Sequence, residues 1–422
     1  MTRLIVFTLL FGVIDFYLYR VVKFLTRNQS SVVQYRWLLM HVGLSLLILL
    51  SFAWVVAVNI NLPYDRSRRW TITILSLVQG IYISKLVAVL FFVIDDIRRL
   101  LVTLKEKVIK QKVKPLQDSK EESNTIPRSA FLSWTGTAIG FTLFGSLLKG
   151  FSNKYNYEIK KITLPFATLP PAFHHFKILQ ISDIHAGSFD NKEAVSRGVA
   201  LMMNEKPDMI VFTGDLVNNR ASEMDEYMEV FAGLKAPYGV YSIFGNHDYG
   251  DYVTWESEEV KKQNLNRLKE IHQQLGWRLL LNEHVSITKG ESSIALLGIE
   301  NWGAGNLSRY GDMEEAHRGS EHYPFKVLLS HDPSHWNAEV CKHYPTIDLT
   351  LSGHTHGLQF GVETSYFKWS PAQWFYKQWA GLYRENKQLL YVNRGFGFIG
   401  YQGRVGIMPE ITVLKLEREY LL

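Results

Sequence analysis

Residues 177–185 read Lys-Ile-Leu-Gln-Ile-Ser-Asp-Ile-His, an apolar run followed at once by a carboxylate and an imidazole. The apolar run predicts a buried β-strand over residues 177–182. Side chains two residues apart on an extended backbone point the same way, so Asp183 and His185 can bind one cation together. The stretch therefore predicts a metal site at the end of a strand.

Four other apolar runs, at residues 209–213, 241–244, 325–330 and 347–351, also release ligand-type side chains where they end. The groups that follow them are Gly214-Asp215, Gly245-Asn246-His247-Asp248, His331 and Gly353-His354-Thr355-His356. Each pattern alone is weak, because polar residues often end strands and a lone buried histidine more often belongs to a core. Five strand ends in one order favour a shared ligand set. Oxygen and nitrogen ligands without a thiolate suit two divalent ions of Mn, Fe or Zn, and we favour Mn.

In this order the motifs resemble the calcineurin-like metallophosphoesterase superfamily, whose signature runs D-x-H, G-D, G-N-H-[DE], H and G-H-x-H. The resemblance covers about residues 160–418. It implies an α/β fold, a four-layer sandwich of two mixed sheets flanked by helices, with the site at the carboxyl ends of the strands. The sequence itself predicts helices at residues 191–205, 221–234 and 256–275, and further strands at 293–299, 388–393 and 411–416.

The resemblance also implies a role for each ligand-type side chain. The first metal would be held by Asp183, His185 and His356. The second metal would be held by Asn246, His331 and His354, with Asp215 bridging the two ions. His247 would be catalytic, contacting the phosphoryl group or protonating the leaving oxygen, and Asp248 would orient it. A hydroxide activated by the cations would attack phosphorus in line.

The first third of the chain predicts a membrane region. Residues 4–19, 37–60, 70–94 and 131–148 are apolar runs close to or above spanning length, although the buried helices of a soluble bundle are an alternative. We expect a transmembrane region of about four helices over residues 1–154, with a charged linker at 97–128, and a phosphoesterase domain over 155–422. Asp15 and Lys85 lie within the runs; a structural ion pair is favoured over a transport role.

Basic residues beside the apolar runs predict the orientation. Thirteen lie in the loops after the first and third runs, against three in the loop after the second. The richer side is expected in the cytoplasm, which places the phosphoesterase domain on the extracytoplasmic side of a cytoplasmic (inner) membrane. The single cysteine, Cys341, excludes an intramolecular disulfide and does not distinguish the two compartments.

Charge divides unevenly along the chain. Residues 1–154 carry 20 Lys and Arg against 8 Asp and Glu, a net charge of +12, whereas the remainder has a net charge of −6. The high isoelectric point therefore reflects the membrane loops and not the catalytic surface. A nucleic-acid substrate needs a basic groove, so this charge distribution argues against one.

Residues 366–383 hold eight aromatic side chains and two lysines, which suits a bilayer interface, a groove for lipid chains, or an insertion packed on the core. With the membrane region, this segment predicts the lipid bilayer as a partner and a lipid-linked phosphorylated substrate. The functional analogy is with the membrane-anchored bacterial branch similar to UDP-2,3-diacylglucosamine pyrophosphatases. These pyrophosphatases act in the cytoplasm. A catalytic domain on the outside would therefore favour another substrate: a phospholipid, a polyprenyl phosphate or a cell-wall phosphodiester.

Two other functions stay open on the sequence alone. The domain could hydrolyse soluble nucleotides or phosphomonoesters, with the membrane part serving only as an anchor. It could also be a non-catalytic, metal-binding membrane sensor. The absence of a metal ligand or of His247 from the sequence would favour that function, but all of these residues are present. Within the glycine-rich stretch 391–400, Arg394 is a candidate phosphate contact.

Overall fold

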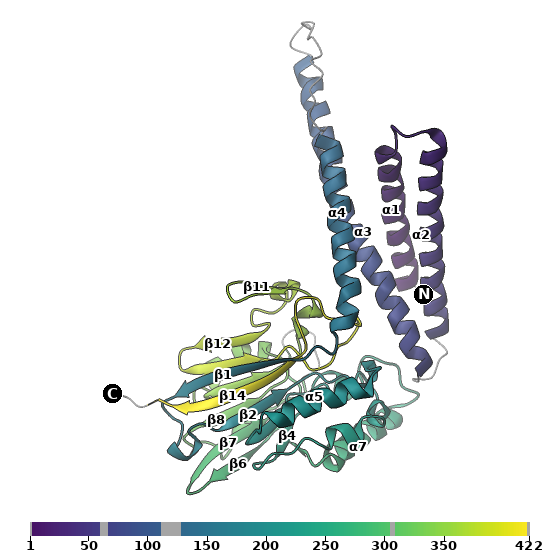
Figure 1. Cartoon of the computed structure of the whole chain (residues 1–422). Coiled ribbons are helices and arrows are strands. Elements are labelled where there is room, and N and C mark those ends of the chain that lie inside the picture. The colour runs from purple at the N-terminus through teal and green to yellow at the C-terminus, as the bar shows by residue number, and fades with distance from the viewer. Residues whose placement is uncertain (1, 60–65, 111–127, 304–308, 420–422) are drawn as a thin grey trace. The chain divides into compact units, whose positions relative to one another are not determined.

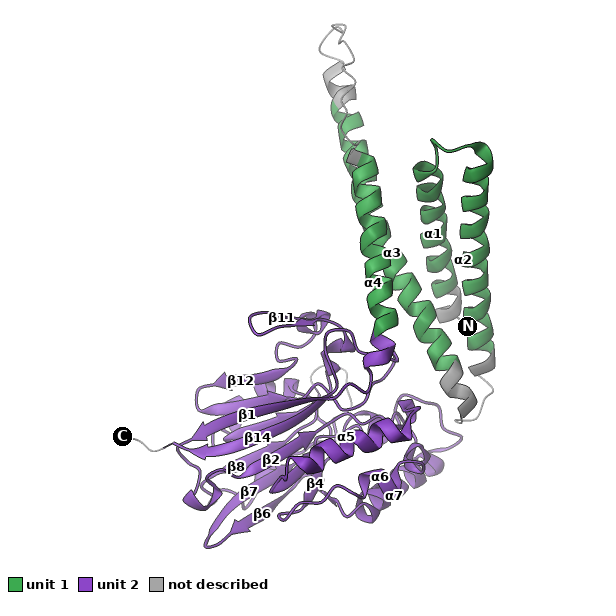
Figure 2. Ribbon diagram, viewed as in Figure 1, with its two compact units in different colours: residues 1–149 green, residues 150–422 purple. Residues whose placement is uncertain are grey.

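The computed structural model describes residues 2–59, 66–110, 128–303 and 309–419. The chain forms two compact units, residues 1–149 and residues 150–422 (Figure 2).

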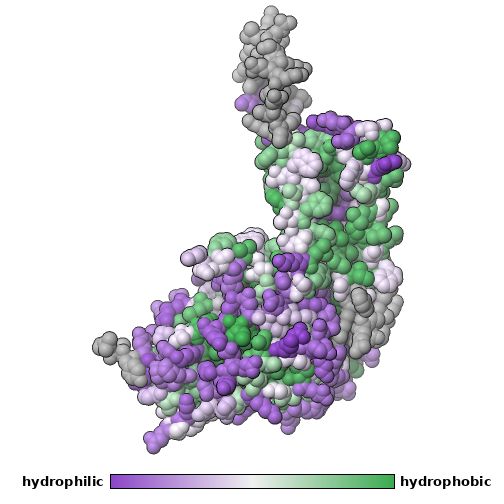
Figure 3. Space-filling model, viewed as in Figure 1, coloured by the Kyte–Doolittle hydropathy of each residue, from purple (hydrophilic) through white to green (hydrophobic). Residues whose placement is uncertain are grey.

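The first unit consists of long helices (Figure 1). They are α1 (Thr2–Leu25), α2 (Ser31–Asn59), α3 (Arg66–Lys110) and α4 (Arg128–Asn153), and the last turn of α4 belongs to the second unit. Within the described residues, three stretches are long and apolar enough to cross a membrane: Ser31–Ala57, Thr71–Lys105 and Ser129–Asn153. Many of their apolar side chains are exposed, and the surface of these helices is largely hydrophobic (Figure 3). This exposure argues against a soluble bundle. Whether α1 also spans stays a prediction.

The two charges predicted within the apolar runs form an ion pair. Lys85 Nζ lies 2.6 Å from Asp15 Oδ1. The hydroxyls of Tyr82 and Ser45 donate to the same carboxylate at 2.7 and 2.9 Å. The Asp15 carboxylate is therefore partnered from α2 and α3, which lowers the cost of placing a charge among apolar helices. This geometry fits the structural role that the sequence favoured.

The charged linker predicted at residues 97–128 is wrong in its first part. α3 continues as a helix to Lys110, and residues 111–127 lie outside the described part of the chain. The physical reason lies in side-chain pairs at helical spacing. Arg98 and Arg99 contact the buried Asp95 carboxylate at 2.8 and 2.6 Å, and such pairs stabilise a helix beyond its apolar stretch.

The second unit contains two six-stranded mixed sheets. The strand order in the first sheet is β1 (Glu158–Phe166), β14 (Glu410–Arg418), β2 (Lys177–Ile181), β3 (Met209–Phe212), β4 (Val240–Ser242) and β5 (Arg278–Leu279). The order in the second sheet is β12 (Gly381–Glu385), β13 (Gln388–Val392), β9 (Leu349–Ser352), β8 (Lys326–Leu329), β7 (Ser292–Gly298) and β6 (Glu283–Lys289). A separate two-stranded hairpin is formed by β10 (Val362–Glu363) and β11 (Lys368–Trp369).

Alternation along the strands divides the apolar residues between layers. Ile178 and Met209 face the core between the two sheets. Their neighbours Leu179 and Ile210 face the opposite way and pack under the helices α5 (Lys192–Asn204) and α7 (Glu258–Gln274). The outer face of the second sheet is covered by α8 (Met313–His317), a helical turn at Trp336–Val340 and α9 (Cys341–His343). The layers are therefore helix, sheet, sheet and helix (Figure 1), the α/β sandwich that was predicted.

Two of the three predicted helices form, and each begins at a capping side chain. Asn191 accepts a hydrogen bond from the backbone of Ala194 at the start of α5, and Ser257 caps α7 in the same way. The helix predicted at 221–234 is wrong. That segment forms only a short turn at Ala221–Met224, whose start is capped by the Glu223 carboxylate accepting the backbone N–H groups of residues 218–220, and the four-residue helix α6 (Met228–Phe231).

Candidate metal centre

The candidate site lies where parallel strands of the two sheets end. β2, β3 and β4 run parallel in the first sheet, and β9 and β8 run parallel in the second. Their carboxyl ends share one edge, so the residues that follow them converge there. The chain is held together at this edge by backbone hydrogen bonds, for example from Asp183 N to Gly214 O at 2.8 Å. All seven predicted metal ligands are brought to this place.

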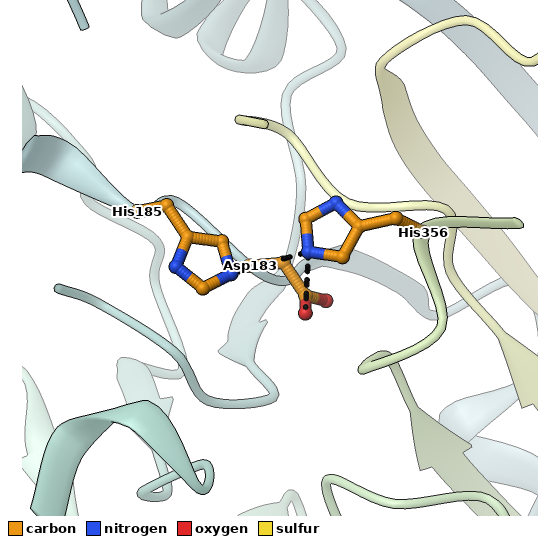
Figure 4. A group of neighbouring side chains, drawn as sticks. All are labelled: Asp183, His185 and His356. Atoms are coloured by element: carbon orange, nitrogen blue, oxygen red, sulfur yellow. Dashed lines mark hydrogen bonds and ion pairs between the residues drawn. The ribbon is translucent and has the colours of Figure 1, made fainter. Parts of the chain in front are cut away.

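The first group of ligand atoms comes from Asp183, His185 and His356 (Figure 4). All three side chains are buried. His356 Nε2 lies 3.2 Å from Asp183 Oδ1 and 3.1 Å from His185 Nε2. Three electron-pair donors therefore point at one another within a buried space, an arrangement that a cation between them would stabilise.

The second group comes from Asp215, His331 and His354, with Asn246 beside them. His331 Nε2 lies 3.2 Å from Asp215 Oδ2 and 3.3 Å from His354 Nδ1. Asn246 Oδ1 faces the same His354 nitrogen at 2.8 Å, while its amide nitrogen donates to the hydroxyl of Tyr252. The hydrogen bond to Tyr252 orients the amide so that oxygen, and not nitrogen, faces the group.

Asp215 lies between the two groups. Its Oδ2 is 3.2 Å from His331 Nε2 of the second group and 3.5 Å from His185 Nε2 of the first. Its Oδ1 accepts a hydrogen bond from the backbone N–H of His247 at 2.9 Å, which holds the carboxylate in this orientation. One carboxylate oxygen is thus within reach of both positions, as a bridging ligand must be.

The backbone at the site is strained in a consistent way. Five of the seven predicted ligands have positive φ angles, at values between 49° and 72°: Asp183, His185, Asp215, His354 and His356. For residues other than glycine this conformation costs of the order of 1–3 kcal/mol each and concentrates at functional sites. Glycine allows the chains to approach, since a Cβ at Gly245 would come within 2.3 Å of Asp215 Oδ1, and one at Gly353 within 2.3 Å of Asp183 Oδ2.

The protonation states suit metal ligands. Burial acts to raise the pKa of the Asp183 and Asp215 carboxyls, but the neighbouring histidines outweigh it and hold both pKa values well below their usual range. Burial lowers the pKa of His185, His354 and His356 and leaves them neutral. Ionised carboxylates and neutral imidazoles are the forms that bind cations, so the residues present fit two divalent ions.

His331 differs from the other three histidines in its ionisation. Burial alone would lower its pKa, but Asp215 and Asp183 raise it to about 10. Its Nδ1 donates to the carbonyl of Thr213 at 2.6 Å, which directs Nε2 toward Asp215. Binding of a cation at His331 Nε2 must therefore displace a proton.

The predicted role of Asp248 as the group that orients His247 is wrong. The Asp248 carboxylate is fully buried and accepts hydrogen bonds from backbone N–H groups, at 2.8–3.3 Å, from Asp215, Leu216, Val217 and Gly245. His247 Nδ1 donates instead to the carbonyl of Asn218 at 2.8 Å. A carboxylate that follows the histidine directly in a helical turn points away from its ring, so Asp248 positions the backbone of Asp215 and does not contact His247 Nδ1.

Besides Tyr252, which bonds Asn246, sequence reasoning missed the side chains of Tyr376 and Arg404, which contact the ligand histidines. The hydroxyl of Tyr376 lies 2.7 Å from His354 Nε2, on the side of the ring away from the second group. Arg404, fully buried, approaches His356 Nδ1 at 3.2 Å and donates to the carbonyl of Arg394 at 2.8 Å. Tyr376 lies in the aromatic segment noted from the sequence, whereas no sequence signal pointed to Arg404.

Arg394 is not available as a phosphate contact. Its side chain is buried and pairs with two carboxylates, Glu410 and, at 2.6 Å, Glu363. The two carboxylates neutralise the guanidinium and accept hydrogen bonds from its Nη1 and Nη2 atoms. The hypothesis that Arg394 binds a phosphoryl group is therefore wrong, and the residue fastens the β10 segment to β14.

Comparisons with known proteins agree with this geometry. Residues 176–358 match the family model described as calcineurin-like phosphoesterase. Residues 1–154 match a second model, described as probable calcineurin-like phosphoesterase, transmembrane domain. The two matches correspond to the two kinds of structure in the chain, the apolar helices and the α/β sandwich.

Three relatives illustrate the range of similar proteins. The chain is 28% identical over 271 residues to a transmembrane protein with metallophosphoesterase domain from Danio rerio, which covers 62% of this chain and 57% of that one. It is 29% identical over 264 residues to the metallophosphoesterase YkuE of Bacillus subtilis, covering 62% and 85%. It is 25% identical over 316 residues to the UDP-2,3-diacylglucosamine pyrophosphatase LpxG of Chlamydia muridarum, covering 63% and 91%. The chain thus spans little more than half of the fish protein.

Proposed function

Because the chain belongs to the calcineurin-like phosphoesterases and carries a transmembrane domain described with them, we propose that it is a membrane-anchored two-metal phosphohydrolase. The bond it cleaves is a phosphomonoester, a phosphodiester or a pyrophosphate. One observation carries the proposal: Asp215 Oδ2 lies within 3.5 Å of a histidine nitrogen in each of two buried ligand groups. A shared carboxylate at this distance suits a pair of cations.

The residues of the site have two roles: most of them hold the metal ions, and His247 takes part in the reaction. Asp183, His185 and His356 hold one ion, and Asn246, His331 and His354 hold the other, with Asp215 common to both. Two divalent ions, when bound, supply an activated water and neutralise the charge that develops on the phosphoryl oxygens. We favour Mn on the mixed oxygen and nitrogen donor set, although Fe and Zn suit it too.

His247 is the group that moves a proton. Its ring centre lies 5.0 Å from that of His185, so it is beside the first ligand group, and it is only half-buried. Because Nδ1 donates to the Asn218 carbonyl, proton transfer to a leaving oxygen must use Nε2. Tyr252 packs against the same ring at 4.5 Å between centres and limits the directions from which a substrate can approach.

A lipid-linked substrate is the finer part of the proposal. Three observations support it: the apolar helices, the aromatic segment that supplies Tyr376 to the site, and the similarity to a protein named for hydrolysis of a diacylated nucleotide sugar. Soluble phosphoesters, with the helices acting only as an anchor, are the competing substrate class. A purely metal-sensing role has less support, since all seven ligands and His247 are present.

The substrate proposal is tested on the full chain in detergent, loaded with Mn²⁺, with His247→Ala as the matched inactive control. Each protein is incubated with a total lipid extract, and phosphorylated species are compared by mass spectrometry. A lipid consumed only by the active protein supports the proposal. Unchanged lipids together with hydrolysis of soluble phosphoesters would reassign the substrate to the soluble class and leave the helices as an anchor.

The orientation of the chain is proposed from the distribution of basic residues. Within the first unit, Arg20 of α1 lies 3.9 Å from Asp96 of α3, and Arg98 of α3 donates to Ser129 of α4. The basic ends of α1 and α3 and the start of α4 are therefore at one end of this unit. With that end in the cytoplasm, α4 carries the chain to the outside.

A reporter phosphatase that is active only outside the cytoplasm tests this orientation in a bacterial host. Fusion after residue 160 is expected to give an active reporter, because this point follows α4. Fusion after residue 28, between α1 and α2, is expected to give none. The opposite pattern would place the catalytic domain in the cytoplasm.

A further inference from the structure

One surface of the second unit exposes large aromatic side chains that its own core does not use. Tyr366 is 100% exposed, Phe375 74%, Trp374 70% and Phe367 58%. We call these four residues the aromatic tip. Tyr366 and Phe367 lie in the β10–β11 turn, Trp374 ends the short helical turn Pro371–Trp374, and Phe375 follows it directly. Other members of the same segment are buried, for example Trp379 at 4%. The segment therefore divides into a packed half and an exposed half.

The base of this segment is tied to the point where α4 ends. Arg404 N donates to the carbonyl of Gly150 in the last turn of α4 at 2.9 Å, and Asn153 donates back to the Arg404 carbonyl at 3.3 Å. The next residue, Val405, exchanges backbone hydrogen bonds at 2.8 Å with Gln359 and Gly361, which lead directly into β10. The backbone of Arg404 and Val405 therefore bonds the end of α4 on one side and the base of the β10–β11 hairpin on the other.

This connection limits how far the aromatic tip can lie from a membrane. The stretch Ser129–Asn153 has 25 residues, and a helix of that length is about 37 Å long, enough to cross a hydrocarbon core of about 30 Å. Its last residue then lies at the membrane surface. From Gly361 to Tyr366 an extended chain reaches about 16 Å. The tip is thus within reach of the leaflet from which α4 emerges.

The chemistry of the tip suits that leaflet. Tyrosine and tryptophan concentrate where acyl chains meet headgroups, because their rings are apolar and their polar atoms stay hydrated. Lys377 is exposed immediately after the tip, and a lysine beside apolar residues favours a surface that contains anionic lipid. An exposed cluster of this kind on a water-facing surface would instead promote aggregation.

We propose that the aromatic tip inserts into the leaflet from which α4 emerges, so that the metal centre faces the headgroups of that leaflet. The second part rests on the proposed function. Tyr376 follows Phe375 directly, and its hydroxyl lies 2.7 Å from His354 Nε2, so a single peptide unit separates an inserted residue from one that contacts a candidate metal ligand. A phosphorylated headgroup in the same leaflet can then reach the site while its acyl chains remain in the bilayer.

Insertion is measured without reference to activity. In a Cys341→Ser background, Phe375→Cys and Tyr366→Cys are labelled with an environment-sensitive fluorophore, and the full chain is reconstituted into vesicles of phosphatidylethanolamine and phosphatidylglycerol. Glu291→Cys, in the exposed turn between β6 and β7, is the control. Lipids brominated on their acyl chains should quench both tip labels, as expected at a depth of about 5–10 Å, and leave the control label unaffected. Equal quenching at all three positions, or at none, would overturn the proposal.

The consequence for the substrate is measured with two phosphodiesters that share a leaving group, ethyl p-nitrophenyl phosphate in solution and hexadecyl p-nitrophenyl phosphate in the vesicles. Tyr366→Ser/Phe367→Ser should lower turnover of the hexadecyl ester at least about tenfold relative to the ethyl ester, because the tip no longer holds the site at the leaflet. If the ratio of the two turnover rates were the same in the variant and the wild type, the proposal that the tip brings the site to the headgroups would be wrong. Quenched tip labels without hydrolysis of either ester would reject the proposed function and leave insertion standing.

Discussion

Asp215→Asn is expected to lower turnover by at least about three orders of magnitude and to reduce the bound metal, because the two ligand groups share this one carboxylate. Asp215 Oδ2 lies 3.2 Å from His331 Nε2 and 3.5 Å from His185 Nε2. Asparagine keeps the shape but removes the charge that would be shared by two cations. Both ions therefore lose affinity, and the remaining ligands no longer hold them at a fixed separation.

The Asp215→Asn substitution is also expected to leave the surrounding structure unchanged. Asp215 has a φ of 64°, a conformation that asparagine adopts more readily than most residues, so the backbone is retained. The amide oxygen can still accept the hydrogen bond from His247 N. Loss of activity would consequently reflect ligation and not misfolding, and a circular dichroism spectrum identical to that of the wild type should confirm this.

The matched control is Asp208→Asn at the opposite end of β3. Asp208 also accepts a backbone hydrogen bond, from Lys177 N at 2.7 Å, but it lies before the strand and away from the ligand groups. Metal content by elemental analysis and turnover should both be near the wild-type values for this variant. Retained turnover or an unchanged metal content in Asp215→Asn would contradict the bridging assignment.

The convergence of the seven candidate ligands was predictable from sequence because each of them is local to a strand end. An apolar run such as residues 177–182 determines a buried strand, and the next polar residues must appear at its carboxyl end. Parallel pairing then brings separate strand ends to one edge without further information. The predicted strand at 209–213 and its Asp215 illustrate this, since β3 ends one residue earlier than expected and the ligand position is unaffected.

Contacts between segments that are distant in the chain could not be predicted from the sequence. Tyr376 and Arg404 reach the histidines from loops whose paths depend on how β10 and the end of α4 pack together. Asp248 was assigned to the wrong partner because the resemblance implied a role for it without showing its contacts, whereas in the structure a helical turn directs it away from the His247 ring and toward the backbone of Asp215. The helix expected at 221–234 forms only as two short segments, Ala221–Met224 and Met228–Phe231.

His247→Ala is expected to retain both metals and to lower turnover by about two to four orders of magnitude, the usual loss when a general acid is removed. His247 is the one histidine of the five motifs whose ring nitrogens belong to neither ligand group. Its Nδ1 is engaged by the Asn218 carbonyl, and its contact with Asp215 is made by the backbone N–H, which alanine retains. The ligand geometry should therefore survive the substitution.

A control with the same kind of hydrogen bond but no catalytic position is available at His284. Its Nδ1 faces the carbonyl of Ala316 at 3.2 Å, and it lies on β6, remote in the sheet from the ligand strands. His284→Ala should leave turnover and metal content close to those of the wild type. If His247→Ala lost metal to the same extent as Asp215→Asn, His247 would have to be a ligand.

The dependence on leaving group separates the two roles that remain for His247. A general acid matters most when the departing oxygen is strongly basic, and little when it leaves readily as an anion. A proton donor therefore predicts a large loss for an alkyl phosphoester and a small one for a p-nitrophenyl ester. A histidine that only contacts the phosphoryl group predicts equal losses for both esters. Because Nε2 is the one ring nitrogen free to reach a substrate, we expect the unequal result.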